Sequence, residues 1–113
     1  MKIIQVAEIE GKCITQYDSE FIMRKILMTE KPTHVGIMHI DPGGIVGYHD
    51  ATVPQILLII EGKGWVRAGA GDKVKVSSGD VIAWDKGEGH ETSTDIGLKA
   101  IVIESEGLEI GSF

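Results

Sequence analysis

A chain of 113 residues is long enough to bury one hydrophobic core and too short for two, so we expect a single domain spanning residues 1–113. The formal net charge of −6 provides no basic stripe for phosphate backbones, which argues against a nucleic-acid partner. Glycine occurs 15 times, whereas proline occurs three times and aromatic residues are few. This mixture is typical of many short strands joined by tight turns.

The cysteine content and the hydropathy pattern favour a cytoplasmic protein without a membrane partner. The single cysteine, Cys13, cannot form an intramolecular disulfide, and Gln5 and Glu8 interrupt the apolar run at the N-terminus. The longest aliphatic run, residues 56–60, is far shorter than the ~18 residues that a membrane span needs.

Strand-length apolar segments alternate with turn residues along the chain. Residues 18–28 permit a helix because an N-cap-like residue begins them, although we expect a strand. A strand at 35–40 runs into the turn Asp41-Pro42-Gly43-Gly44. Further strands are expected at 45–49, 53–60, 65–68, 74–76, 81–84, 90–94 and 98–104, separated by turns at 61–64, 69–72, 77–80, 85–89 and 95–97. This spacing predicts an all-β sandwich or barrel.

The strand expected at 53–60 is apolar on both faces. Leu57 and Ile59 share one face, and Ile56 and Leu58 share the other, because successive side chains of a strand point in opposite directions. Such a strand needs a covering layer on each side, either a second sheet or a second copy of the protein. We therefore expect a homodimer.

Two glycine-punctuated stretches each contain one histidine. The first stretch contains Gly43, His49, Gln55 and Gly62. It resembles the first signature motif of the cupin superfamily, which is Gly, five residues, His-x-His, three or four residues, Glu, six residues, Gly. In this sequence Ala51 occupies the position of the second histidine and Gln55 that of the glutamate.

The second stretch resembles the second cupin motif, which is Gly, five residues, Pro-x-Gly, two residues, His, three residues, Asn. Gly79, Gly87 and His90 match this pattern, whereas Asp85 replaces the proline and Thr94 replaces the asparagine.

With motifs at 43–62 and 79–94, the resemblance covers about residues 35–104. It implies a double-stranded β-helix, a jelly-roll barrel that is often dimeric.

The resemblance also implies a metal site. A metal-binding cupin would hold Mn, Fe, Ni, Cu or Zn with three imidazoles and one carboxylate, whereas this chain offers His49, His90 and the amide of Gln55. All three groups are neutral, so a divalent ion would keep its full charge inside the barrel and we expect it to be held weakly. Alternatively, both histidines line a polar barrel mouth without a ligand, and Gln55 is a hydrogen-bonding core residue.

Other residues could form the walls of the ligand pocket. Tyr48 and Trp84, with Trp65, combine apolar area with one polar group, although core or dimer packing would explain them equally well. His39 is a candidate third imidazole, or else a structural histidine near the barrel wall. We expect His34 at an exposed strand end.

Three functions remain open. The interpretation we favour is a barrel that binds a small organic molecule without converting it, because no carboxylate of suitable parity accompanies the histidines. The first alternative is a metal-dependent enzyme that resembles cupin dioxygenases or isomerases, with His49, Gln55 and His90 holding the ion. The second alternative is a structural or regulatory dimer whose site no longer functions.

Overall fold

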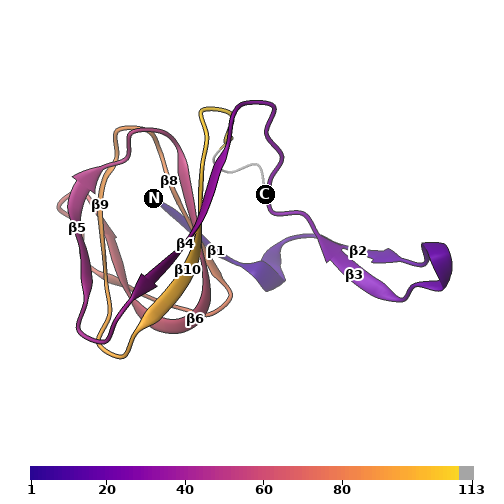
Figure 1. The fold of residues 1–113 in the computed structure, drawn as a ribbon, viewed down its shortest axis with the longest axis horizontal. Helices are drawn as coiled ribbons and strands as arrows, with labels where there is room; N and C mark the ends of the chain where they lie inside the picture. The colour runs from indigo at the N-terminus through magenta and orange to yellow at the C-terminus, as the bar shows by residue number, and fades with distance from the viewer. Residues whose placement is uncertain (110–113) are drawn as a thin grey trace.

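The computed structural model describes residues 1–109, and its regular secondary structure is almost entirely β-strand, which confirms the all-β prediction (Figure 1). None of these residues belongs to a helix that is both long and apolar enough to span a membrane. In chain order the elements are β1 (Lys2–Gln5), the 3₁₀ turn η1 (Val6–Glu8), β2 (Gly11–Ile14), the 3₁₀ turn η2 (Gln16–Asp18), β3 (Phe21–Arg24), β4 (His34–Ile40), β5 (Ile45–Asp50), β6 (Gln55–Ala68), β7 (Val74–Ser77), β8 (Asp80–Trp84), β9 (Gly89–Ser93) and β10 (Leu98–Glu104).

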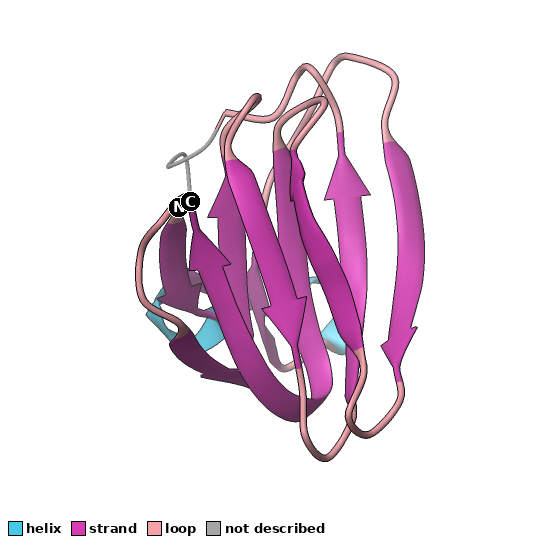
Figure 2. Cartoon of the chain, turned by 90° about the vertical axis from the view of Figure 1, so that its left-hand side faces the viewer, coloured by secondary structure: helices cyan, strands magenta, loops and turns pink. Residues whose placement is uncertain are grey.

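The long strand β6 connects two antiparallel layers. Its first part pairs with β8 and β10, within the order β1-β8-β6-β10-β4, and its second part pairs with β7 and β9. Strand β5 extends the second layer by pairing with β9, and the layers face each other (Figures 1 and 2). In the described part of the chain, β4 pairs only with β10 and β5 only with β9, so no ladder joins these two strands.

The turn predicted at 61–64 is wrong, because β6 runs through it without a break. The two glycines of this segment bend the strand rather than end it. Gly62 has a φ of +83° and lies against the backbone of Gly97, while Gly64 lies against Ser93. Neighbouring strands pair on both sides of the bend, so the backbone groups of residues 61–64 stay in ladders instead of forming a hairpin turn.

The strand preference for residues 18–28 is confirmed at its centre, where β3 pairs with β2 in a separate two-stranded hairpin. Figure 1 shows this hairpin extending away from the two main layers. Strand β1 was not predicted from the sequence. It pairs with β8, and Ile3 lies opposite Ile82.

Two apolar clusters explain why β6 is apolar on both faces. Leu57 and Ile59 belong to the cluster between the layers, and both are 1% exposed. Ile56 belongs to a second cluster on the outer face, which Leu27 and Leu108 help to form. Part of the predicted second covering layer is therefore supplied by the chain itself.

The bend in β6 leads to a stability prediction. A Cβ at Gly62 would collide with the carbonyl oxygen of Gly97, and φ is in the left-handed region. We expect Gly62→Ala to lower the free energy of unfolding by about 3 kcal/mol in urea denaturation. Gly79 also has a positive φ, but a Cβ there would meet open space, so Gly79→Ala should cost only about 1 kcal/mol. Equal losses in the two variants would contradict the close approach at Gly62.

Candidate functional site

The two motif histidines face each other across a pair of strands. His49 on β5 lies directly opposite His90 on β9, and the centroids of their rings are 4.5 Å apart. The ladder is irregular between Val46 and His49. This bulge changes the parity of β5, so both Val46 and His49 face the space between the layers.

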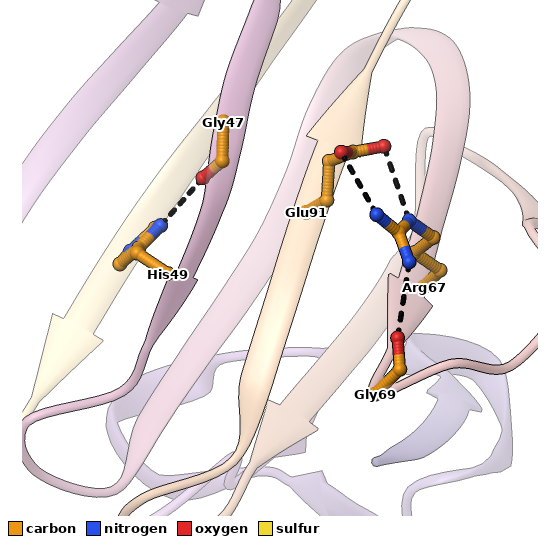
Figure 3. Close-up of polar contacts among 5 residues, drawn as sticks. All are labelled: Gly47, His49, Arg67, Gly69 and Glu91. Carbon is orange, nitrogen blue, oxygen red and sulfur yellow. Dashed lines mark hydrogen bonds and ion pairs between the residues drawn. The ribbon is translucent and has the colours of Figure 1, made fainter.

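Backbone carbonyl groups orient both imidazoles. The Nδ1 atom of His49 lies 2.7 Å from the carbonyl oxygen of Gly47 (Figure 3), and Nδ1 of His90 lies 3.1 Å from that of Glu88. A carbonyl oxygen only accepts, so Nδ1 carries the proton in each ring. An imidazole whose single proton is on Nδ1 has a lone pair on Nε2, and no hydrogen bond occupies either Nε2 within residues 1–109.

A buried tryptophan supports this pair. The ring of Trp84 stacks on that of His90, with centroids 4.1 Å apart and an interplanar angle of 20°. Trp84 is 1% exposed, and its Nε1 is buried without a hydrogen-bond partner among the described residues. A buried donor without a partner is costly, so a group that enters the adjacent cavity and accepts this hydrogen bond would be stabilised.

The environment of His90 keeps its ring neutral. Burial lowers the pKa of the His90 imidazole below its ordinary value of 6.5, the hydrogen bond to Glu88 partly offsets this effect, and the nearby His49 lowers the pKa further. At neutral pH the buried ring is therefore an electron-pair donor through Nε2 rather than a cation.

A cavity of about 290 Å³ adjoins the histidine pair. Its walls include the apolar side chains of Met38, Leu57 and Val102. The polar side chains in the wall are His34, His49, Gln55, His90, Thr92 and Glu104. The site thus combines an apolar enclosure with several polar groups, as small-molecule sites usually do.

Sequence reasoning missed Glu104. His34 is exposed at the start of β4, as expected, but it was not expected to line the cavity. Glu104 lies opposite Gln55 of β6 on one side and opposite His34 of β4 on the other. The amide Nε2 of Gln55 donates to Oε1 of Glu104 at 2.9 Å. The expectation that no carboxylate accompanies the histidines is therefore wrong. Because alternate residues of a strand share a face, His34 lies on the same face of β4 as Met38, and this pattern could have suggested it. Glu104 lies on β10, and no motif spacing connects this strand with the two histidines.

Two predicted pocket residues lie outside this cavity. Tyr48 points away from it, and its ring packs beneath Arg67 with the guanidinium carbon 4.9 Å from the ring centroid. His39 is exposed and lies near Asp41 and Lys99 in a different hollow. The structure brings His49, Gln55, Trp84 and His90 together and leaves Tyr48 and His39 apart from them.

Glu91, which follows His90 on β9, also lies outside the site. Its two oxygens accept hydrogen bonds from Nε and Nη2 of Arg67, each at 3.3 Å (Figure 3). Nη1 of Arg67 donates to the carbonyl of Gly69 at 3.0 Å. This pairing raises the pKa of Arg67 and lowers that of Glu91, so both stay charged and neither is available to the cavity.

The departures from the cupin motifs have structural roles. Ala51, at the second histidine position, is 5% exposed and packs in the core between the layers. Thr94, at the asparagine position, donates its hydroxyl to the carbonyl of Lys63 at 2.6 Å and accepts from the amide of Gly97 at 2.9 Å. Ala51 and Thr94 thus contribute packing and hydrogen bonds within the fold.

The polar residues do not form a preorganised metal site. Residues 1–109 contain no group of three or more His, Cys, Asp or Glu side chains placed to hold a metal ion. Two imidazoles and a neutral amide are one ligand short of the three imidazoles and one carboxylate expected in a metal-binding cupin. The carboxylate of Glu104 is hydrogen-bonded to that amide. Metal binding by His49, Gln55 and His90 stays a prediction.

Comparison with known proteins identifies the fold. No family model and no curated protein matches the sequence. A cupin superfamily protein from Desulfitobacterium hafniense DCB-2 has a similar structure, with a TM-score of 0.61 and 14% identity over 70% of this chain and 71% of that one. A protein with a double-stranded β-helix domain from Klebsiella pneumoniae aligns with a TM-score of 0.62 and 18% identity over 75% and 76% of the two chains.

The chain has the fold of small cupin proteins. A third similar structure, a predicted oxalate decarboxylase from Thermotoga maritima, is 25% identical and covers 90% of the cupin-like protein and 96% of its own chain, with a TM-score of 0.60. The resemblance first seen in the two sequence motifs is thus confirmed at the level of the fold.

The lowered pKa of His90 predicts a pH dependence. The unfolded chain takes up this proton at an ordinary pKa, so the free energy of unfolding should fall as the pH drops from above about 6.5 through the lowered pKa of the folded state. Urea denaturation of a His90→Gln variant should show a smaller decrease than the parent protein over this window. The exposed His39→Gln variant should retain the full decrease, and a full decrease in His90→Gln would contradict the assignment.

Proposed function

We propose that this cupin-like protein binds a small organic molecule that presents hydrogen-bond donors, in the cavity beside His49 and His90. The observation that carries the proposal is the orientation of the two rings, since both Nδ1 atoms are committed to backbone carbonyls. Each Nε2 is then an acceptor, next to a cavity of about 290 Å³. In this proposal, the layers close around the ligand as a jelly-roll barrel.

The other cavity groups support the same class of ligand. Gln55 uses its amide nitrogen to donate to Glu104, which leaves the amide oxygen as a further acceptor. The carboxylate of Glu104 adds negative charge, so hydroxyl or ammonium groups suit the site better than a carboxylate does. Trp84 Nε1 is the exception, a buried donor that one acceptor atom of the ligand would satisfy. Met38, Leu57 and Val102 would enclose its carbon skeleton.

A metal-dependent enzyme is the second candidate. The observation in its favour is the similarity to the predicted oxalate decarboxylase, which extends over 90% of this chain at 25% identity. Against it, the described residues lack a group of three ligating side chains. We therefore place non-catalytic binding first and derive no reaction step.

Binding can be tested with small probes of opposite chemistry. Thermal shift measurements would compare a polyol and amine series, such as glycerol, erythritol and ethanolamine, with acetate and oxalate. We expect the polyols and amines to raise the melting temperature, because the cavity offers acceptors, and the carboxylates to have no effect. Tryptophan fluorescence should change in parallel, since Trp84 lies in the cavity wall.

Matched variants locate the effect. His49→Ala and His90→Ala should abolish the shift, whereas His39→Ala should retain it, because His39 lies in a different hollow. A response to carboxylates alone, or an equal response in all three variants, would contradict binding between the two rings. No response to any probe would favour the structural dimer whose site no longer functions.

A single substitution tests the role of Gln55 in metal affinity. Gln55→Glu restores the carboxylate that the cupin motif has at this position, beside a second carboxylate on Glu104. We expect calorimetric titration with Mn²⁺ or Zn²⁺ to show at least about tenfold tighter binding than in the parent protein. Gln55→Ala is the control and should not gain affinity. Tight stoichiometric binding by the parent protein would instead favour the enzyme.

A further inference from the structure

A second cavity opens on the outer face of the second layer, away from the two histidines. Its volume is about 460 Å³, within the range of roughly 300–1,000 Å³ that is typical of small-molecule sites. The walls come from β6, β7 and the turn between β9 and β10. The side chains that matter here are those of Lys63, Trp65, Lys75, Asp95 and Ile96. We call this cavity the tryptophan pocket.

Strand alternation directs the side chains of this pocket outward. Val66 of β6 and Val76 of β7 are 1% and 3% exposed and belong to the cluster between the layers. Their neighbours along each strand therefore point to the opposite face. Trp65 lies directly opposite Lys75 in the ladder, and Lys63 lies two residues before Trp65 on the same face. The indole ring and the two lysines thus lie together on the side away from the histidine cavity.

Hydrogen bonds hold one wall of the tryptophan pocket in place. The hydroxyl of Thr94 donates to the carbonyl of Lys63 at 2.6 Å, and the amide of Gly97 donates to that hydroxyl at 2.9 Å. The amide of Lys63 in turn donates to the carbonyl of Gly97 at 3.3 Å. The turn that carries Asp95 and Ile96 is therefore fastened to β6, so this wall is formed before a ligand binds.

The two lysines of the pocket form no ion pair with any of residues 1–109. Other cations of the chain are neutralised locally, since Arg67 pairs with Glu91 and Lys99 with Glu61. Asp95 places one carboxylate in the wall. Two positive charges and one negative charge leave a local excess of one positive charge, although the whole chain carries −6. The electrostatics of the pocket therefore favour a ligand with one anionic group.

Trp65 provides a flat apolar surface beside these charges. Its side chain is half-buried, so part of the indole ring faces the pocket. Ile96, which is 59% exposed, adds apolar area from the turn. An indole ring packs well against another aromatic ring in an offset or edge-to-face arrangement. The apolar part of the pocket therefore favours a planar ring.

We propose that the tryptophan pocket binds a small aromatic carboxylate. The ring packs on Trp65, and the carboxylate accepts hydrogen bonds from the ammonium groups of Lys63 and Lys75. The Cβ atoms of residues directly opposite in a ladder are about 5 Å apart, and residues two apart on a strand are about 7 Å apart, so both lysines reach one anion beside the indole. This site is separate from the histidine cavity, so the inference does not depend on the function proposed above.

The indole N–H signals of the two tryptophans report which cavity is occupied. In protein labelled with nitrogen-15, each tryptophan gives one such signal, and Trp65→Phe assigns them. Titration with phenylacetate should shift the Trp65 signal to saturation and leave that of Trp84 unchanged, because Trp84 lies in the wall of the histidine cavity. Acetate, which lacks the ring, and benzylamine, which carries the opposite charge, should not shift the Trp65 signal.

Single lysine variants test the charge requirement. Lys63→Gln and Lys75→Gln should each raise the dissociation constant of phenylacetate about fivefold, because one charge-assisted hydrogen bond is lost from an exposed pair. Both side chains are exposed, so the variants should fold normally. Lys86→Gln is the matched control. It removes the same charge from a lysine that pairs with Glu106 outside the pocket, and it should retain the parent affinity.

Three results would overturn the proposal. The first is a Trp65 signal that phenylacetate does not move, or that acetate or benzylamine moves equally. The second is an unchanged affinity in both pocket variants. The third is a shift of the Trp84 signal alone, which would place phenylacetate beside the histidines instead.

Discussion

The strand β6 is the constraint on which the rest of the structure depends, because its 14 residues belong to both layers. Its pairing with β10 places Gln55 opposite Glu104, and its pairing with β9 places Ala68 opposite His90. The bend at Gly62 turns one layer over the other, so that Gln55 of the first layer and His90 of the second line one cavity. Rigid strands position such a site more accurately than loops would.

The chemistry of the site follows from what the backbone leaves unoccupied. The Nδ1 of each histidine donates to a backbone carbonyl, burial keeps His90 neutral, and Gln55 donates one amide N–H to Glu104. The result is a cavity rich in acceptors, with Trp84 as its buried donor without a partner among the described residues. The lone pairs of these acceptors suit both a metal ion and an organic molecule with hydrogen-bond donors, but residues 1–109 contain no three His, Cys, Asp or Glu side chains placed together to hold an ion.

The two faces of the first layer have different surroundings. The inner face of β4 and β10 carries His34 and Glu104 toward the cavity, whereas the outer face carries Ile103 and the 62% exposed Val35. Strand alternation makes this division of roles automatic.

The sequence by itself determined the all-β class, most strand positions and the meeting of His49 with His90. Strand 98–104 was predicted with the bounds of β10, and the motif spacings selected the two histidines that pair. These features depend on local alternation, turn residues and fixed separations, all of which are visible along the chain.

Tertiary structure decided the continuity of β6, the pairing of β1, and the entry of His34 and Glu104 into the site. The glycines at 62 and 64 have the composition of a turn, and only ladders to strands distant in sequence keep that segment extended. Glu104 lies between His34 and Gln55 because of the registers of β10 with β4 and with β6. A register is set by packing across the sheet rather than by any local sequence pattern.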